Sequence, residues 1–281
     1  MNLRSKVRQL RLYLKSKSLF SAHLATPSIA WRLPFLPGST HVELTTTSGR
    51  TFRMLARHWP LLPSACRLQN IGATFEFLDD AKRIEVDGLI LYSPLWSREE
   101  ASYYREVLID DAYQVKNRNL SGRTVVDVGA YVGDSAIAYA RQGAFVHAFE
   151  PSIAFCGFIR RNLAANRLES NVRLHEVGLA EREEEVISRN DRLILVEGVD
   201  YILEHLPRNI DILKLDCEGS EYHLLADTRF LGHLRPREIR MEYHRGASAI
   251  ASHLREAGYS LKFYSDDNPV GLLYARRNDD S

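Results

Sequence analysis

The chain has 281 residues, 45% of them hydrophobic and 26% charged, which is the composition of an ordinary globular protein. This length suffices for one large domain, or for a domain of roughly 150 residues with an appendage, and it excludes a small cross-linked scaffold. No segment approaches the ~18 uninterrupted apolar residues of a membrane span. The three cysteines, Cys66, Cys156 and Cys217, are far apart and lack a CxxC spacing. We therefore expect neither disulfides nor a zinc site, and a cytoplasmic location.

The net charge of +1 conceals two regions of opposite sign. Residues 1–120 hold 17 Lys and Arg against 11 Asp and Glu, a net charge of +6, whereas residues 121–281 hold 20 against 25, a net charge of −5. We expect two domains: residues 1–105, with a basic N-terminal helix and β-hairpins, and residues 106–281, with an alternating strand and helix pattern.

Residues 2–17 are predicted to form a short basic amphipathic helix. Its apolar positions recur at helical spacing among Arg and Lys, and they are Leu3, Val7, Leu10 and Leu14. These interleaved charges interrupt the apolar core that a secretory signal needs, so we expect no export. We expect the helix to pack on its own domain; peripheral contact with a membrane surface or an acidic partner is the alternative.

Two segments of the basic region alternate between apolar and polar residues, as half-buried strands do. Residues 41–56 alternate around the turn Ser48-Gly49, and residues 73–92 alternate around Asp79-Asp80 and Asp87-Gly88. Both patterns predict β-hairpins. A tyrosine-rich connector then spans residues 98–118.

From Arg123 onward, short apolar runs alternate with helical patterns. The predicted strands are Thr124–Val128, Phe145–Phe149, Val172–Glu176, Asp211–Leu215 and Glu238–Tyr243, and the predicted helices are Ser135–Gln142, Ile153–Arg167, Val199–His205, Ser220–Asp227 and Ala247–Ala257. Two further strands, Ser260–Tyr264 and Gly271–Arg276, are separated by too few residues for a crossover helix, so they should pair antiparallel. We predict an α/β fold with a doubly wound, mostly parallel seven-stranded sheet and an antiparallel edge strand, preceded by a smaller hairpin-containing region.

The first predicted strand of this sheet leads into a glycine turn. Gly129 and Gly133 permit a sharp turn from strand to helix and the close approach of a ligand, and the helix start should offer free amide donors. Asp127 would repel a pyrophosphate, but it suits a cofactor that carries an ammonium and a sulfonium group. The dinucleotide pattern GxGxxG is absent.

Glu150 ends the second strand and could accept both ribose hydroxyls of an adenosine cofactor. The alternative is a charge that complements the N-terminus of the helix beginning near Ser152.

Two later clusters should meet this loop at the carboxyl edge of the sheet. Lys214 and Asp216 share one face of a buried strand, so we expect them to pair; this is either a structural ion pair or part of a site where Asp216 and Glu218 line the mouth. Glu242 and His244 share one side of another strand. A His beside carboxylates can act as a general base, and a hydrogen-bonded structural His is the alternative.

Four motifs, in order and spacing, resemble those of the FkbM family of S-adenosylmethionine (AdoMet)-dependent methyltransferases. They are the glycine loop Val126–Ser135, the FEP of Phe149–Pro151, the KxDxEGxE of Lys214–Glu221 and the ExH of Glu242–His244. The resemblance covers about residues 103–276. One departure is Tyr131, where the family usually has Asn.

The resemblance implies O-methylation of a hydroxyl on a sugar, a glycolipid or another small metabolite, with AdoMet as the cofactor. We expect a small acceptor rather than a nucleic acid. In the expected mechanism His244 accepts the hydroxyl proton and Glu242 orients it. The expected catalytic residues are His244, Glu242, Asp216, Lys214 and Glu218. The expected cofactor-binding residues are Asp127, Gly129, Ala130, Tyr131, Gly133, Asp134, Ser135, Glu150, Pro151, Ser152, Gly178 and Asp216.

Three alternatives remain at this point. We expect no bound metal, although Asp216, Glu218, Glu242 and His244 offer ligands for a divalent one. A non-catalytic AdoMet-binding protein on the same fold would share the loop. A nicotinamide-dependent oxidoreductase would also use Glu150 and a glycine turn, but Asp127 and the antiparallel tail disfavour it.

Overall fold

The computed structural model describes residues 17–97, 100–179, 184–187, 193–263 and 269–278. The chain divides into two compact units, Met1–Asp110 and Asp111–Ser281. All but the last residue of the predicted basic helix over residues 2–17 lies outside the described part. Among the described helices, none has the length and apolar character that crossing a membrane requires.

The N-terminal unit contains both predicted hairpins. Strands β1 (His41–Thr45) and β2 (Thr51–Leu55) pair antiparallel. Strands β3 (Thr74–Phe77), β4 (Ala81–Val86) and β5 (Leu89–Pro94) form a three-stranded antiparallel sheet. The helical elements of this unit are α2 (Ile29–Arg32), η1 (Leu33–Phe35), η2 (Ala56–Leu61), α3 (Leu62–Asn70), α4 (Glu100–Tyr104) and η3 (Arg105–Ile109). The segment expected to be a connector therefore begins with helical structure.

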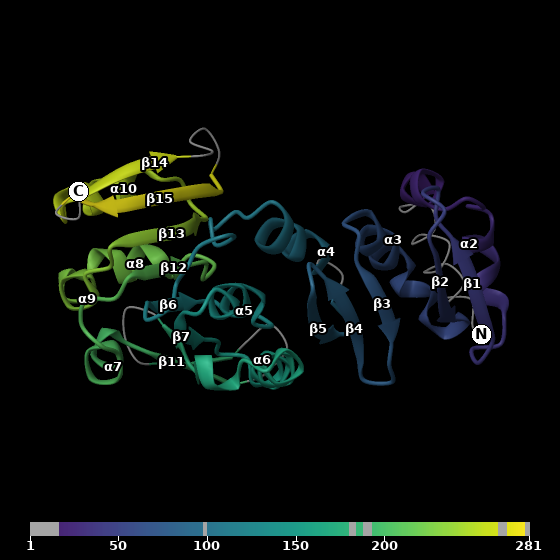
Figure 1. Ribbon diagram of the computed structural model, residues 1–281, viewed down its shortest axis with the longest axis horizontal. Coiled ribbons are helices and arrows are strands. Elements are labelled where there is room, and N and C mark those ends of the chain that lie inside the picture. Colours follow the sequence, from purple (N-terminus) through teal and green to yellow (C-terminus); the bar gives the residue numbers. More distant parts are fainter. Residues whose placement is uncertain (1–16, 98–99, 180–183, 188–192, 264–268, 279–281) are drawn as a thin grey trace. The chain divides into compact units, whose positions relative to one another are not determined.

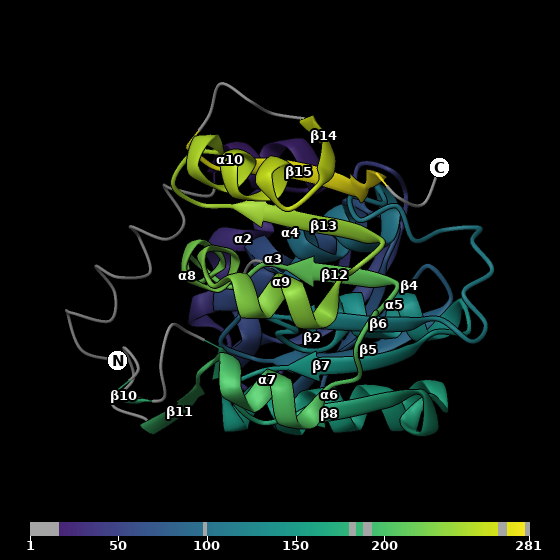
Figure 2. The same ribbon diagram turned by 90° about the vertical axis from the view of Figure 1, so that its left-hand side faces the viewer.

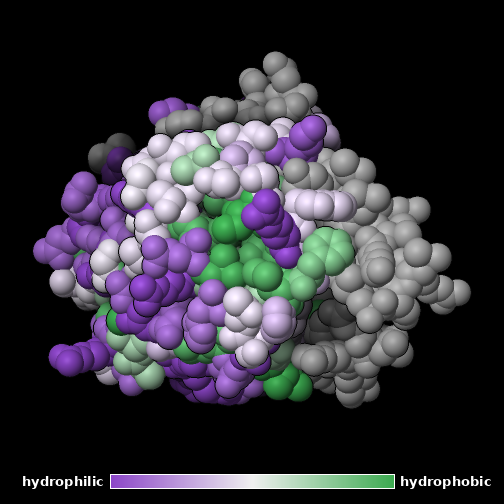
Figure 3. Space-filling view, turned by 90° about the vertical axis from the view of Figure 1, so that its right-hand side faces the viewer, coloured by the Kyte–Doolittle hydropathy of each residue, from purple (hydrophilic) through white to green (hydrophobic). Residues whose placement is uncertain are grey.

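A buried ion pair lies inside the N-terminal unit. The side chains of Lys82 and Glu100 are fully buried and in contact. Lys82 also donates to the backbone oxygen of Ser97, and the hydroxyls of Ser64 and Ser97 donate to the Glu100 carboxylate. The hydrogen bonds compensate for the loss of water around both charges. On the face that Figure 3 shows, hydrophobic side chains gather in the middle, with hydrophilic ones to their left and below.

The C-terminal unit is the predicted α/β fold. Its seven-stranded sheet has the order β14-β15-β13-β12-β6-β7-β8, and the strands are stacked in this order from top to bottom in Figure 2. The strands are β6 (Thr124–Val128), β7 (Phe145–Phe149), β8 (Val172–His175), β12 (Ile212–Leu215), β13 (Glu238–Tyr243), β14 (Tyr259–Phe263) and β15 (Gly271–Arg277). Each predicted strand and helix of this unit is present, with ends within one residue of those predicted.

Helices cover both faces of this sheet (Figures 1 and 2). Helices α5 (Asp134–Arg141) and α6 (Ile153–Asn166) lie on one face. The other face carries α7 (Val199–His205), α8 (Glu221–Ala226), α9 (Thr228–Leu234) and α10 (Ser248–Glu256). A short 3₁₀ helix, η4 (Glu169–Asn171), precedes β8. Because both faces are covered, the central strands are buried throughout, as their continuous apolar runs predict.

The structure differs from the prediction in three details. Strand β15, which is antiparallel to both of its neighbours, is the second strand from the edge. The edge strand is β14, which follows α10 in the chain. Three short strands, β9 (Gly178–Leu179), β10 (Glu184–Ile187) and β11 (Leu193–Glu197), form a separate small sheet that the sequence pattern did not indicate. Helix α9 was also not predicted.

Candidate functional site

The candidate site lies at the point of the sheet where the strand order changes direction, next to β6. After β6 the chain adds β7 and β8 on one side, and it then returns to place β12 on the other side of β6. In open α/β sheets, ligands bind in the crevice beyond the carboxyl ends of the strands at such a switch point. The loops that follow β6, β7, β12 and β13 carry the four predicted clusters, so all four share one edge of the sheet.

The two loop glycines are required by the packing of the chain itself. Both adopt left-handed backbone conformations, with φ of +82° at Gly129 and +89° at Gly133. A Cβ atom on Gly129 would lie 1.8 Å from the backbone oxygen of Asp216, and one on Gly133 would lie 3.4 Å from Ile159. Gly129 therefore lets the loop after β6 pack directly against the end of β12, and both positions need a left-handed conformation that glycine adopts without strain.

The loop amides are already used within the protein. The N–H groups of Gly129 and Ala130 donate to the backbone oxygen of Phe149, and the N–H of Tyr131 donates to the Glu150 carboxylate at 2.9 Å. These three groups precede α5, so the free donors expected at the start of that helix are not among them.

Glu150 is held at both of its oxygens by backbone N–H groups. Oε2 accepts from Tyr131, and Oε1 accepts from Ser152 at 2.8 Å. Burial raises the pKa of Glu150 to about 7, although these two hydrogen bonds lower it in part. Each oxygen retains further acceptor capacity, so the carboxylate can still accept from hydroxyl groups. The Ser152 side chain caps α6 by accepting from the N–H of Phe155.

The neighbours of Glu150 pack tightly. A Cβ atom on Gly178 would lie 3.3 Å from Pro151, so these two predicted cofactor residues pack against each other. Tyr131 has a φ of +52°, and its ring packs against Phe155 with 4.6 Å between ring centroids. A left-handed backbone conformation is costly for an aromatic residue and tolerable for Asn, which accounts for the Asn that is usual at this loop position.

Lys214 connects the glycine loop with the later clusters. Its Nζ lies 3.0 Å from Asp127 Oδ1 and 3.9 Å from Asp216 Oδ2, and it donates to the backbone oxygen of Gly129 at 2.8 Å. Asp127, rather than the predicted Asp216, is thus the nearer partner. The other oxygen of Asp127 accepts from the Ser135 hydroxyl at 2.6 Å. The charge of Asp127 is therefore compensated within the protein by Lys214.

Three carboxyl groups, those of Asp127, Asp134 and Asp216, nevertheless lie around the single ammonium group of Lys214. Burial alone would lower the pKa of Lys214, but Asp127, Asp216 and Asp134 together raise it above its usual value. Burial raises the pKa of Asp134 to about 7, as it does for Glu150. Burial is the main cause of both raised pKa values, and the Lys214 ammonium lowers each of them only in part.

His244 is oriented by a buried carboxylate that the sequence reasoning did not assign. Its Nδ1 lies 3.0 Å from Glu221 Oε1, and its backbone N–H donates to the same oxygen. Glu221 is fully buried, and its Oε2 accepts from the N–H of Gly219 at 2.8 Å. Glu221, the first residue of α8, therefore has the role predicted for Glu242. It is the last acid of the KxDxEGxE motif, which was its only sequence signal.

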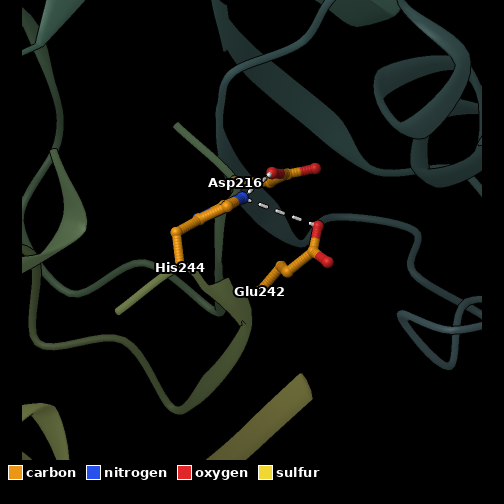
Figure 4. A group of neighbouring side chains, drawn as sticks. All are labelled: Asp216, Glu242 and His244. Atoms are coloured by element: carbon orange, nitrogen blue, oxygen red, sulfur yellow. Dashed lines mark ion pairs between the residues drawn. The ribbon is translucent and has the colours of Figure 1, made fainter. Parts of the chain in front are cut away.

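The other ring nitrogen of His244 faces three carboxylates. Its Nε2 lies 3.7 Å from Asp216 Oδ1, 3.8 Å from Glu242 Oε2 and 3.9 Å from Glu218 Oε2. Figure 4 shows Asp216, Glu242 and His244 pointing toward one another. The Glu218 side chain is 90% exposed, whereas the other two carboxylates are about half as accessible or less. The predicted convergence of these four groups is present.

The protonation of His244 bears on its predicted role. The hydrogen bond to Glu221 raises the pKa of His244 to about 9, although burial lowers it. The ring is therefore an imidazolium at neutral pH, and an imidazolium cannot accept a proton. His244 could act as a base, or as a ligand of a metal ion, only after it has lost this proton.

Tyr113 is a second residue that the sequence reasoning missed. Its hydroxyl donates to Asp216 Oδ2 at 3.1 Å, and its ring centroid lies 5.5 Å from the Lys214 ammonium. The side chain is buried. Its sequence position in a tyrosine-rich segment gives no signal of this contact.

The chain is similar to one family of methyltransferases and to several solved structures. Residues 127–261 match the family described as the Methyltransferase FkbM domain. Curated protein sequences gave no match. Among solved structures, the methyltransferase FkbM of Methylobacillus flagellatus KT is similar at 14% identity and a TM-score of 0.47, over 94% of this chain and 59% of that chain. TYW2 of M. jannaschii, in complex with AdoMet, is similar at 13% identity and a TM-score of 0.46, over 72% and 87% of the two chains. The METTL16 MTase domain is similar at 12% identity and a TM-score of 0.46, over 84% and 86%.

Proposed function

Because residues 127–261 form a methyltransferase domain of the FkbM family, we propose that the chain uses AdoMet to methylate a hydroxyl group of a sugar, a glycolipid or another small metabolite. The observation that carries this proposal is the position of Lys214. It contacts the glycine loop through Gly129 and Asp127, and it lies 3.9 Å from Asp216 of the His244 cluster. The glycine loop and a group of proton-carrying side chains therefore adjoin each other.

The carboxyl groups at this edge of the sheet suit both the ribose hydroxyls and the positive charge of AdoMet. Glu150 can accept from the two ribose hydroxyls, as the corresponding acid does in nucleotide-binding sheets. The buried Asp134 and Glu150, whose pKa values are raised to about 7, gain when a positively charged ligand enters.

When bound, AdoMet supplies a methyl group on a sulfonium: an acceptor oxygen forms the new C–O bond, and the electron pair of the broken C–S bond passes to sulfur. The chain has to align the hydroxyl with this methyl group and to remove the hydroxyl proton. On the acceptor side lie the carboxyl groups of Asp216 and Glu242, and His244 Nε2 lies within 4 Å of both. We assign the hydroxyl proton to this cluster, from which it passes to water.

The test combines product identification with matched variants. Purified chain is incubated with labelled AdoMet and small hydroxylated metabolites, and mass spectrometry identifies the labelled products. Glu242→Gln should slow turnover roughly 10²-fold or more while S-adenosylhomocysteine binding by calorimetry stays unchanged. Glu204→Gln on the exposed side of α7 is the control and should retain turnover.

Binding of S-adenosylhomocysteine without transfer to any hydroxyl would favour the non-catalytic alternative. Transfer of the label to nitrogen or to RNA would contradict the proposed acceptor. Equal turnover by Glu242→Gln and the control would remove the cluster from the reaction.

A further inference from the structure

We propose that Asp216, Glu242 and His244 bind a divalent cation of the Mg²⁺ or Mn²⁺ class, which holds the acceptor hydroxyl during methyl transfer. The cation site rests on the geometry of these side chains alone, and only its role in transfer rests on the proposed function. The site would replace the metal-free mechanism that we expected from the sequence.

The distances from His244 to each of the two carboxylates suit ligands around one ion. One ligand atom from each residue can be chosen so that all three lie within 4.8 Å of one another. Oxygen and imidazole ligands lie about 2.0–2.2 Å from such ions, so two ligands of one ion are at most about 4.4 Å apart. His244 Nε2 is 3.7 Å from Asp216 and 3.8 Å from Glu242, which is within that range and longer than a hydrogen bond.

Two of the three side chains form hydrogen bonds with residues outside the cluster, through the atom that faces away from the proposed ion. Glu221, fully buried, accepts from the Nδ1 side of His244 and thereby turns Nε2 toward the carboxylates. Tyr113 donates to Oδ2 of Asp216, which leaves Oδ1 on the side of His244. A carboxylate behind the imidazole, and a hydrogen bond to the rear oxygen of a ligating carboxylate, are the outer contacts typical of metal ligands in proteins.

The backbone supports of the site are rigid, and its front is accessible. Strands β12 and β13 are adjacent and parallel, so Asp216 and Glu242 come from neighbouring strand ends. The side chains of Asp216, Glu242 and His244 are 30%, 26% and 15% exposed. Solvent and an acceptor can therefore occupy the remaining coordination positions.

The chemistry of the donor set selects the class of ion. Two carboxylates and one imidazole favour hard or intermediate cations, which take oxygen ligands and keep several waters. The Cys217 thiol is directed to Glu221, at 3.5 Å, and does not join the set. A cation bound here would also lower the pKa of a coordinated hydroxyl, which helps the acceptor lose its proton at neutral pH.

The cation itself is the probe in the decisive experiment. The full chain is treated with EDTA, dialysed into metal-free buffer and titrated with Mn²⁺, whose free concentration is read from its electron paramagnetic resonance signal. We expect one Mn²⁺ per chain. Glu242→Gln should weaken its binding at least 10-fold, and Glu221→Gln, which removes only the support behind His244, about 10- to 100-fold. Glu204→Gln should bind Mn²⁺ like the wild type.

Calorimetry with S-adenosylhomocysteine shows for each variant that the C-terminal unit remains folded. Failure of the wild type to bind Mn²⁺ would overturn the cation site and leave an ion-paired cluster. Equal Mn²⁺ affinity in Glu242→Gln and the wild type would overturn it as well, because the ion would then lie elsewhere. Loss of the proposed function has a different signature: Mn²⁺ binds as expected, but no hydroxyl acceptor is methylated with or without it.

Discussion

The substitution Lys214→Met tests whether the buried Lys214–Asp127 ion pair stabilises the C-terminal unit. Both side chains are almost fully buried, and their charged atoms lie 3.0 Å apart. Without the ammonium, Asp127 keeps only the Ser135 hydroxyl as its polar contact among the interactions described above. Removing one partner of a buried ion pair leaves an uncompensated charge, which costs about 3–5 kcal/mol. We expect the free energy of unfolding of the C-terminal unit to fall by this amount.

The distribution of tryptophan allows the two units to be followed separately. All three tryptophans, Trp31, Trp59 and Trp96, belong to the N-terminal unit. In a urea titration, tryptophan fluorescence therefore reports the N-terminal unit, while far-UV circular dichroism reports both. Lys214→Met should lower the midpoint of the C-terminal transition by about 1–5 M urea, taking an m-value of about 1–3 kcal/mol/M. The fluorescence transition should stay in place.

A double-mutant cycle distinguishes the interaction between Lys214 and Asp127 from an unspecific loss of stability. Asp127→Asn removes the buried charge that Lys214→Met leaves behind, so the double variant should lose much less stability than the sum of the two single losses. The reasoning is refuted if Lys214→Met alone costs under about 1 kcal/mol, which is the range of an exposed pair. It is also refuted if the two losses simply add.

Three further predictions use the same measurements. Lys82→Met leaves Glu100 buried without its ammonium partner, so the fluorescence transition should shift by a similar amount while the C-terminal transition does not. Because the pKa of Glu150 is about 7, S-adenosylhomocysteine should bind more tightly as the pH rises through 7, and Glu150→Gln should weaken binding and flatten this dependence in calorimetry. Burial lowers the pKa of both His147 and His175 to about 4, from 6.5. Their contribution to stability is thus complete above pH 6.5 and is lost as the pH falls toward 4, so melting followed by circular dichroism should show progressive destabilisation over that range; a constant melting temperature would contradict this.

The strands of the C-terminal unit could be predicted because they are buried on both faces. Such strands appear in the sequence as continuous apolar runs bounded by charged residues and glycine. The runs at β6, β7 and β13 have the predicted ends. By contrast, β9 has two residues and β10 begins with two glutamates, so neither has a hydrophobic period long enough to be detected. Strand β15 lies between β13 and β14. This order depends on pairing between distant segments, which no local sequence pattern indicates.

The partner of Lys214 was mispredicted for a geometric reason. Asp216 is two residues along the same strand, about 6.6 Å away at 3.3 Å per residue, whereas a neighbouring strand lies only about 4.8 Å away. In the parallel pairing of β12 with β6, Lys214 stands directly beside Asp127. Side-chain alternation along one strand therefore identified the correct face, but the strand order, which the sequence does not state, decides which acid is nearest.

The same reasoning connects the reassigned role of Glu242 with the cation site. Two residues apart on one strand, Glu242 and His244 project in the same direction, so the carboxylate meets the tip of the imidazole, Nε2, rather than Nδ1 near the backbone. Nδ1 has to be satisfied from an element that passes behind the ring, and Glu221 at the start of α8 does this. An ExH pair at the end of a strand thus directs two ligand atoms to one point in front of the sheet. The carboxylate that orients the histidine must come from elsewhere in the fold, so Glu242 does not have that role.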